Sequence, residues 1–388
     1  MYQRFCNPLL SNSFFLFGAR GTGKTSLLQN LLPESSTTLW IDLLDEELYN
    51  RILAHPSYFE QLIPEHFGPD CWVVADEIQR IPSLLNYVHK IIEKRGIRFA
   101  LSGSSARKLK RTSANLLAGR AFNNLIFPLT AQELHTDFQL SKILQWGSLP
   151  LISSLTSDTA CQEYLRSYVS NYLRQEIREE QLIRRLDPFV RFLEIAAQMN
   201  GKILNASQVG RDSGTDPKTI IRYYQILEDT LLGFFLEPFH RSIRKIQTEK
   251  AKFYLFDLGV CRALRSDLTS SVNPGTYAYG EAFEHFFILE CHRLRHYQRV
   301  DERAYYLRTK DDVEIDLILE RPKGELYVIE IKSAHTVDEK KLGGFIKLAR
   351  ELKPKAILIA SNEDRPRYLA PDVQVLPWRD VLTMLYPG

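Results

Sequence analysis

Cysteine is scarce in this sequence, and no two cysteines stand close enough to form a recognisable pair. The five cysteines of the 388 residues are scattered singly, and none forms a C-x-x-C motif. An odd, dispersed set of this kind argues against both a disulfide framework and a zinc site. We therefore expect a reducing environment, and a cytoplasmic protein.

Long apolar runs and a strong excess of one charge are also missing. The start "MYQRFCNPLL" has no signal-peptide core, and runs such as "LLGFFLEPF" are too short to span a bilayer. The net charge of +3 is small, so overall charge indicates neither a nucleic-acid nor a membrane partner. We expect no membrane association, and we find no internal repeat or low-complexity tract.

The length and the residue pattern predict an α/β protein of several domains. Residues 1–135 alternate helical patterns with the apolar runs "SFFLFG", "TTLWIDL", "CWVVADE", "IRFALSG" and "NNLIFPL". This rhythm predicts a parallel sheet of the P-loop NTPase kind with helices on both faces. Residues 136–265 predict a helical connector and a winged-helix segment, and residues 266–388 a second α/β domain of the PD-(D/E)xK kind.

A phosphate-binding loop is predicted between the first strand and the first helix. "GARGTGKT" fits G-x-x-x-x-G-K-T, where backbone amides and the helix N-terminus bind phosphate, the lysine reaches the β- and γ-phosphates, and the threonine ligates Mg²⁺. The alternative is a glycine-rich turn that binds no nucleotide. The residues expected to contact ATP here are Gly18, Arg20, Gly21, Thr22, Gly23, Lys24, Thr25 and Ser26.

Further candidate residues for ATP hydrolysis follow later strands. In "WVVADE" we expect Asp76 to hold the Mg²⁺ shell and Glu77 to polarise the attacking water, although an acidic pair can also simply cap a helix. Ser102 lies at the end of the strand expected in "FALSGSSA" and either senses the γ-phosphate or belongs to an ordinary turn. Arg120 either reaches a phosphate, in its own chain or across a subunit interface, or forms a surface salt bridge.

At these motifs the chain resembles AAA-type ATPases of the archaeal-ATPase-like kind. The order "GARGTGKT", "VVADEIQRIP", "FALSGSSARKL", "WGSLP", "GEAFEHF", "YLRTKDDVEIDLIL" and "IEIKSA" is similar to prokaryotic proteins that join this ATPase to a C-terminal domain of unknown function 4143. The resemblance implies an ATPase, a winged-helix segment and a restriction-endonuclease-like terminal fold. It implies no settled physiological role, and a homo-oligomer formed through the ATPase domain is a candidate assembly.

The middle segment carries a pattern typical of a winged helix. Residues 205–232 predict helix, turn and helix, and "FFLEPF" with "AKFYLFD" is the expected wing. Lys218, Arg222 and Tyr223 on the second helix, with the run "HRSIRKIQTEK", are candidates for DNA contact. Acidic residues on the same helix favour the alternative, a module that contacts protein; these are Asp216, Glu228 and Asp229.

Charged residues interrupt two apolar runs in "VEIDLILERPKGELYVIEIKSA", residues 313–334. If "RPKGE" closes a five-residue hairpin loop, Glu320 pairs with Leu326, and Asp316 lies opposite Glu330. Glu330 and Lys332 share one face of their strand because side chains alternate. Two carboxylates and one ammonium group would then converge.

This spacing matches the PD-(D/E)xK nuclease core, which also takes an acid from a preceding helix. Glu284 in "GEAFEHF" is the expected helix acid, with Glu281 as the alternative. We expect Asp316, Glu330 and Glu284 to bind Mg²⁺, while Lys332 stabilises the attacking hydroxide. The alternative is a degenerate fold in which these charges form only a buried ion network.

Two interpretations of function follow. In the first, ATP and Mg²⁺ drive an enzyme whose nucleotide state controls DNA binding or DNA cleavage by the C-terminal domain. In the second, the chain is a nucleotide-controlled switch or scaffold with a non-catalytic nuclease fold.

Overall fold

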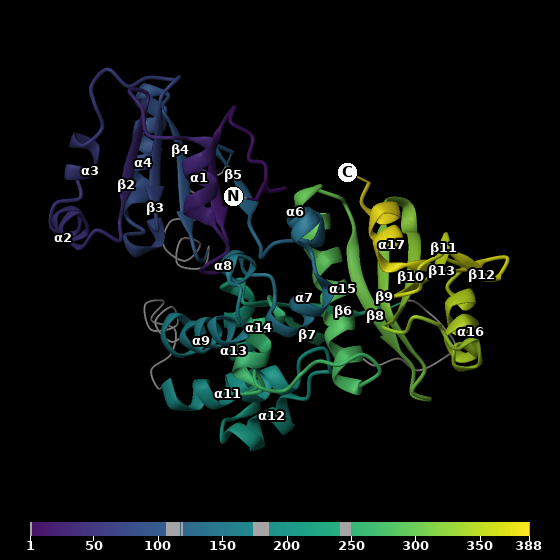
Figure 1. Cartoon of the computed structure of the whole chain (residues 1–388). Helices are drawn as coiled ribbons and strands as arrows, with labels where there is room; N and C mark the ends of the chain where they lie inside the picture. The colour runs from purple at the N-terminus through teal and green to yellow at the C-terminus, as the bar shows by residue number, and fades with distance from the viewer. Residues whose placement is uncertain (1, 106–116, 118, 174–185, 241–249, 388) are drawn as a thin grey trace. The chain divides into compact units, whose positions relative to one another are not determined.

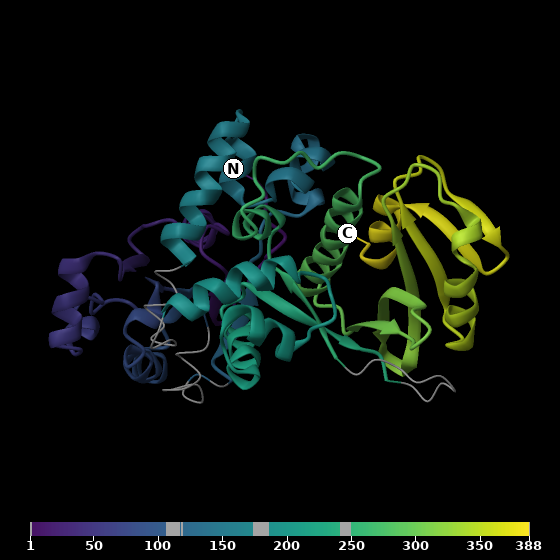
Figure 2. The ribbon, with the colours of Figure 1, turned by 90° about the horizontal axis from the view of Figure 1, so that it is seen from below.

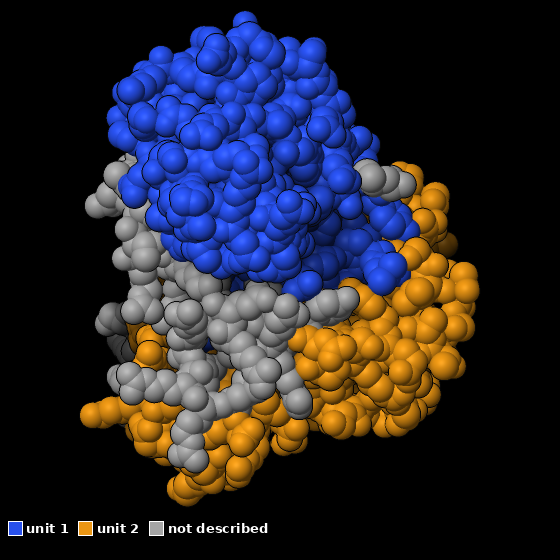
Figure 3. Space-filling model, turned by 90° about the vertical axis from the view of Figure 1, so that its left-hand side faces the viewer, with its two compact units in different colours: residues 1–129, 149–151, 226–232 blue, residues 130–148, 152–225, 233–388 orange. Residues whose placement is uncertain are grey.

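The structure, a computed structural model, describes residues 2–105, 117, 119–173, 186–240 and 250–387. The chain divides into two compact units, which Figure 3 colours separately. The first unit comprises residues 1–129, 149–151 and 226–232, and the second comprises residues 130–148, 152–225 and 233–388. The boundaries expected after residues 135 and 265 stay predictions, because this division separates compact units and not sequence segments.

The first unit contains a five-stranded, all-parallel sheet in the order β2-β3-β4-β1-β5 (Figure 1). This confirms the predicted parallel α/β fold. The strands are β1 (Ser13–Phe17), β2 (Thr38–Asp42), β3 (Trp72–Asp76), β4 (Arg98–Gly103) and β5 (Ala121–Leu125). The helices are α1 (Lys24–Leu31), α2 (Glu46–Ala54), α3 (Tyr58–Gln61) and α4 (Leu84–Arg95).

Both faces of this sheet are buried, which explains why its strands are apolar throughout. Phe15 and Phe17 join an apolar cluster with residues of α2, α3 and α4, while Phe14 and Leu16, which point the other way, are fully buried too. The strand expected over "NNLIFPL" is corrected to Ala121–Leu125. Ile126 adds one hydrogen bond to Phe17, of 2.8 Å, and Pro128 soon afterwards has no amide hydrogen to continue the pairing.

Short helices connect the first sheet to the second. They are α6 (Ala131–Leu134), α7 (Leu140–Trp146), α8 (Pro150–Ser154), α9 (Asp158–Ser167), α11 (Leu186–Gln198), α12 (Ala206–Ser213) and α13 (Pro217–Asp229), whereas α14 (Leu258–Leu264) follows the first two strands of the second sheet. A π-helical turn, Tyr168–Leu173, follows α9. Within the described ranges, no helix is both long and apolar enough to cross a membrane.

The second unit contains an eight-stranded mixed sheet in the order β12-β13-β11-β10-β9-β8-β6-β7. Helices α15 (Tyr277–Tyr297) and α17 (Trp378–Leu385) pack on one face, and α16 (Gly343–Glu351) packs on the other (Figures 1 and 2). The strands are β6 (Gly233–Pro238), β7 (Lys252–Leu255), β8 (Arg303–Arg308), β9 (Glu314–Arg321), β10 (Glu325–Lys332), β11 (Ala356–Ser361), β12 (Arg367–Ala370) and β13 (Val373–Pro377).

The hairpin expected to be the wing also belongs to this second sheet. Strands β6 and β7 pair antiparallel, as expected, but β6 also pairs in parallel with β8 at Glu237–Tyr305 and Pro238–Tyr306. An isolated hairpin would leave an open edge, and pairing with β8 satisfies its backbone groups. The assignment of this segment as a winged helix stays a prediction, and β7 forms an edge of the C-terminal sheet.

Candidate functional site

Residues 18–23 form the loop that joins β1 to α1 at one end of the parallel sheet. Gly21 and Gly23 have φ angles of 77° and 94°, values that residues with a Cβ rarely adopt. A Cβ atom on Gly18 would lie 2.4 Å from the carbonyl oxygen of Ile126. Glycine is thus required at three positions of a loop that leads into a helix N-terminus, where anions bind.

Lys24 and Thr25 begin α1, and Asp76 ends β3. The buried Lys24 donates from Nζ to the carbonyl oxygen of Gly18 at 2.9 Å. Thr25 Oγ1 donates to Asp76 Oδ2 at 2.7 Å. The structure therefore brings together the hydroxyl, carboxylate and ammonium groups expected to act on ATP and Mg²⁺.

Ser102 at the end of β4 connects Asp76, the last residue of the neighbouring strand β3, with Glu77, which follows it. Its hydroxyl donates to Asp76 Oδ1 and accepts from the backbone amide of Glu77, the latter at 3.3 Å. This arrangement follows from the strand order, because β4 lies between β3 and β1. Ser102 orients the acidic pair in this structure, and its action on a γ-phosphate stays a prediction.

Strands β9 and β10 pair in the expected register, but the loop between them is corrected from the five residues of "RPKGE" to Pro322–Gly324, because Arg321 and Glu325 pair as well. Glu320 pairs with Leu326, and Leu317 with Ile329. Asp316 Oδ2 accepts from the backbone amide of Ile331 at 2.8 Å, so its carboxyl group lies against β10.

Asp316, Glu330 and Lys332 form a tight charged group. Lys332 Nζ lies 2.6 Å from Glu330 Oε1, whereas Glu330 Oε2 is buried without a hydrogen-bond partner. Burial, reinforced by the charge of Glu330, raises the pKa of Asp316 well above its usual range. The adjacent carboxylates raise the pKa of Lys332 although burial opposes this, so the lysine stays charged.

Glu284 on α15 lies near this group, but two residues that sequence analysis missed hold it. Tyr254 donates from its hydroxyl to Glu284 Oε1 at 2.7 Å, and Lys252 Nζ lies 3.4 Å from the same oxygen. The charge of Glu284 raises the pKa of Asp316. Glu281, the alternative helix acid, instead pairs with Lys202 and Arg265, each at 3.5 Å.

The three predicted metal ligands do not form a preassembled metal site. Among the residues that the structure describes, no three His, Cys, Asp or Glu side chains lie where they could hold one metal ion together. Each expected ligand instead contacts a different group: Tyr254 and Lys252 for Glu284, the Ile331 amide for Asp316, and Lys332 for Glu330. The metal role of Glu284, Asp316 and Glu330 therefore stays a prediction.

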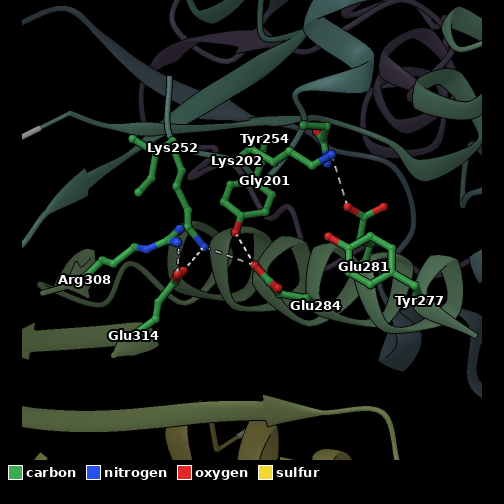
Figure 4. A pocket seen from close by; sticks show the side chains of 11 residues that line it. Gly201, Lys202, Lys252, Tyr254, Tyr277, Glu281, Glu284, Arg308 and Glu314 are labelled. Carbon is green, nitrogen blue, oxygen red and sulfur yellow. Dashed lines mark hydrogen bonds and ion pairs between the residues drawn. The ribbon is translucent and has the colours of Figure 1, made fainter. Parts of the chain in front are cut away.

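A pocket of about 410 Å³ opens beside Glu284. Figure 4 shows Lys252, Glu284 and Glu314 pointing toward one another, with the Tyr254 hydroxyl directed at Glu284. Both acidic and basic side chains line this pocket, so it is polar and has no dominant charge.

Comparison with known proteins assigns both ends of the chain. Residues 11–135 match the family model "AAA domain", residues 279–381 match "Domain of unknown function (DUF4143)", and residues 137–271 match "Domain of unknown function (DUF8612)". The chain pairs an AAA domain with a domain of unknown function 4143. The AAA domain is a nucleotide-binding P-loop ATPase module, as the sheet order and loop geometry above indicate.

Related proteins are uncharacterized. One from Mycobacterium tuberculosis is 26% identical over 326 residues, which cover 83% of this chain and 70% of that protein. One from Methanocaldococcus jannaschii is 20% identical over 363 residues, which cover 87% of this chain and 79% of that protein.

Similarity to solved structures is low. The Aeropyrum pernix ORC1 protein in complex with DNA gives a TM-score of 0.30 at 11% identity, covering 66% of this chain and 87% of that one. Can2 from Sulfobacillus thermosulfidooxidans in complex with cyclic tetra-adenylate gives a TM-score of 0.22 at 10% identity, covering 96% of this chain and 98% of that one.

Sequence analysis missed Gln79 in the AAA domain. Glu77 has a φ angle of 58°, in the left-handed region, and Gln79 Nε2 donates to Glu77 Oε2 and, at 3.1 Å, to Ser104 Oγ. Gln79 is buried, so this contact holds the Glu77 carboxylate from within the domain. The signal in the sequence was a polar residue two positions after Glu77.

A second missed residue, Arg4, lies before the residues that match the AAA domain and supports the phosphate loop. Its guanidinium donates to the carbonyl oxygens of Thr22, at 2.7 Å, and Phe127, at 2.6 Å. Thr22 is buried and donates from Oγ1 to the Ala19 carbonyl at 2.7 Å. The half-buried Arg20 and the exposed Ser26 lie beside this loop, and their nucleotide contacts stay predictions.

Arg120 forms an ion pair with Glu93 of α4 in the AAA domain. Its guanidinium lowers the pKa of the Glu93 carboxyl group by hydrogen bonding and charge. Both side chains are substantially exposed, so the salt bridge that was the alternative to phosphate contact is present. Contact between Arg120 and a phosphate stays a prediction.

The segment between the two named domains contains the expected helix pair α12 and α13. Lys218 and Arg222 are exposed, but Tyr223 is buried and packs edge-on against Phe189, with ring centroids 4.9 Å apart. Tyr223 is therefore a core residue and not a DNA contact. Of the basic run "HRSIRKIQTEK", residues 241–249 lie outside the described residues.

Proposed function

We propose that the chain binds and hydrolyses ATP with Mg²⁺ at the AAA domain. The observation that carries this proposal is the hydrogen bond of 2.7 Å between Thr25 Oγ1 and Asp76 Oδ2, next to the buried Lys24. Hydroxyl and carboxylate oxygens are the ligands that Mg²⁺ prefers, so these two residues fit its binding. When bound, the ion would offset the charge of the phosphates.

The residues of this site have separate tasks in hydrolysis. Lys24 would exchange its carbonyl partner for the β- and γ-phosphates, and the loop amides would bind the remaining phosphate oxygens. Glu77 would orient the attacking water and accept its proton. Lys24 therefore controls binding, whereas Glu77 controls turnover.

Two variants of the full chain test this assignment by separating ATP binding from hydrolysis. We expect Lys24→Ala to abolish ATP binding, and Glu77→Gln to bind ATP without hydrolysing it. Lys94→Ala, an exposed lysine at the end of α4, is the matched control and should behave as wild type. Hydrolysis by Glu77→Gln at the wild-type rate would show that Glu77 does not have this role.

We also propose that nucleotide state controls DNA binding or metal-dependent DNA cleavage by the C-terminal domain, which we take to be restriction-endonuclease-like. The observation that favours cleavage is Glu330 Oε2, a buried carboxylate oxygen without a partner, in the same group as Asp316 and Lys332. An unsatisfied buried oxygen costs free energy, and a divalent cation would satisfy it. Asp316 and Glu284 are the other residues that would hold this cation, and Lys332 would stabilise the attacking hydroxide.

The alternative is a nucleotide-controlled switch or scaffold in which this site is a structural ion network. The ion pairs of Glu330 with Lys332 and of Glu284 with Lys252 support it. Incubation with single- and double-stranded DNA, Mg²⁺ or Mn²⁺ and ATP separates the two. Cleavage should be lost in Asp316→Ala and Lys332→Ala but kept in Glu325→Gln, which changes an exposed acid at the start of β10, the strand of Lys332. Cleavage that all variants retain would come from a contaminant.

Location and assembly belong to the same proposal. The five cysteines are free and buried, which supports a reducing, cytoplasmic location.

A homo-oligomer formed through the AAA domain would place Arg120 near a neighbouring subunit's nucleotide. Light scattering with and without ATP tests this assembly.

A further inference from the structure

Lys252, a residue that the proposed reactions do not use, lies in the middle of the C-terminal charged group. It comes from β7, and only 4% of its side chain is exposed. Its Nζ lies 2.5 Å from Glu314 and 3.4 Å from Glu284. Tyr306 adds a ring face 5.3 Å from the same ammonium group. Lys252 is therefore a buried cation held by two carboxylates and an aromatic ring.

The segment that supplies Lys252 lies outside the domain of unknown function 4143. Lys252 and Tyr254 belong to residues 137–271, whereas Glu284 and Glu314 belong to residues 279–381. The pairing of β6 with β8 brings this hairpin to the edge of the second sheet. The charged group is thus completed by two segments that match different family models.

The charges of this group make Lys252 a counter-ion. The carboxyl groups of Glu284, Glu314, Asp316 and Glu330 interact electrostatically within this group. Burial raises the pKa of Asp316 and of Glu330. Lys332 offsets Glu330, and Lys252 offsets Glu284 and Glu314. A divalent cation that used Glu284 would meet the Lys252 ammonium at the same oxygen, Oε1.

We propose that Lys252 is a tethered counter-ion that competes with a divalent cation for Glu284 and thereby weakens metal binding at the C-terminal site. This inference rests on the metal-dependent function proposed above. Binding of the cation requires the ammonium to leave Glu284, and the pocket of about 410 Å³ that Lys252 lines has room for its displaced side chain (Figure 4). The β6–β7 hairpin thus determines how readily the site accepts a metal.

Binding of Mn²⁺ to the nucleotide-free full chain tests the proposal without measuring activity. Electron paramagnetic resonance of free Mn²⁺ gives the dissociation constant. Lys252→Met keeps the length of the side chain and removes its charge, so it should bind Mn²⁺ at least about tenfold more tightly than wild type. Lys202→Met removes a half-exposed ammonium from the rim of the same pocket and should leave the affinity within about twofold.

Further variants locate the binding and guard against misfolding. Glu330→Gln removes a carboxylate from the proposed site. It should therefore abolish Mn²⁺ binding at this site in the wild-type background, and it should abolish the tighter binding when combined with Lys252→Met. Lys252→Gln keeps a hydrogen-bond donor and should also bind more tightly, so it replaces Lys252→Met if that variant is unfolded by circular dichroism. A merely structural lysine predicts the opposite, a lower Tm and unchanged or weaker binding.

Two results would overturn the inference, and they are distinguishable. If wild type binds Mn²⁺ through Glu330 and folded Lys252 variants bind no more tightly, Lys252 does not compete and the metal site stands. If neither wild type nor Lys252 variants show Glu330-dependent binding, the metal site itself is wrong.

Discussion

Thr25 donates a hydrogen bond of 2.7 Å to Asp76, a residue 51 positions later in the chain. The contact links the first turn of α1 to the end of β3, across the position of β4 in the sheet order. Ser102 at the end of β4 bonds the other oxygen of Asp76. The neighbouring strands β3 and β4, and helix α1 that follows β1, thus contribute to one polar site at the carboxyl ends of the strands.

Removing the Thr25 hydroxyl tests this contact. We expect Thr25→Ala to lower kcat/KM for Mg²⁺-ATP by about 10–100-fold, the usual loss for an altered metal ligand or its partner. Thr25→Ser keeps the hydroxyl and should stay close to wild type. Steady-state ATPase assays over a range of Mg²⁺ concentrations measure the effect. Wild-type activity of Thr25→Ala at limiting Mg²⁺ would contradict the assignment.

Gln79 offers a second test, because it donates hydrogen bonds to Glu77 and Ser104. Gln79→Ala frees the Glu77 carboxylate, so kcat should fall by about ten- to a hundredfold while the Kd for a non-hydrolysable ATP analogue stays within about twofold. Asn86→Ala, which removes an exposed amide from α4, is the control. Equal losses in affinity and turnover would indicate damage to the whole domain.

Helix α13 carries two exposed basic residues, Lys218 and Arg222, whose contribution to DNA binding can be tested without disturbing the core. Lys218→Ala with Arg222→Ala should leave Tm unchanged and reduce the slope of log Kd for DNA against log salt by about 2, because each basic residue releases roughly one counterion. Lys94→Ala should leave that slope unchanged. The absence of a gel shift at low salt, or a salt slope equal to wild type in the double variant, would remove DNA from the partners of this segment.

Tyr223, on the same helix, should behave in the opposite way. It is buried against Phe189 and Phe192, so Tyr223→Ala should destabilise the fold by roughly 3 kcal/mol or more. Chemical denaturation measures this loss. A wild-type unfolding midpoint for Tyr223→Ala would contradict the packing.

Glu290 of α15 predicts a pH dependence of stability. Burial raises its pKa to about 7, although Arg293 opposes the shift. Between pH 4.5 and about 7 the folded chain therefore holds a proton that the unfolded chain has lost, and the free energy of unfolding falls as pH rises through this window. The total loss is on the order of 3 kcal/mol.

Glu290→Gln isolates this effect from other titrating groups. The difference in unfolding free energy between wild type and Glu290→Gln should shift in favour of the variant as pH rises from 4.5 to 7, and level off above it. Urea denaturation at several pH values gives the difference. A difference that does not vary with pH would show that Glu290 keeps an ordinary pKa.

The sequence by itself determined the features that depend on residues close together in the chain. The glycines of "GARGTGKT" and the apolar runs on each side predicted the strand, loop and helix, because backbone freedom and burial are local properties. The Pro/Gly turn within "RPKGE" predicted the pairing of Glu320 with Leu326, since a hairpin loop sets the register of its strands, although the loop itself is three residues long and not five.

Only the tertiary structure decided which distant side chains meet. Lys252 reaches Glu284 because β6 pairs with β8, and a single lysine in an apolar strand carries no periodic signal of its partner. Tyr223 shows the same limit: its helical position is compatible with solvent or core, and packing against α11 buried it. Such contacts join segments far apart in the chain, so local pattern does not determine them and the packing of whole elements does.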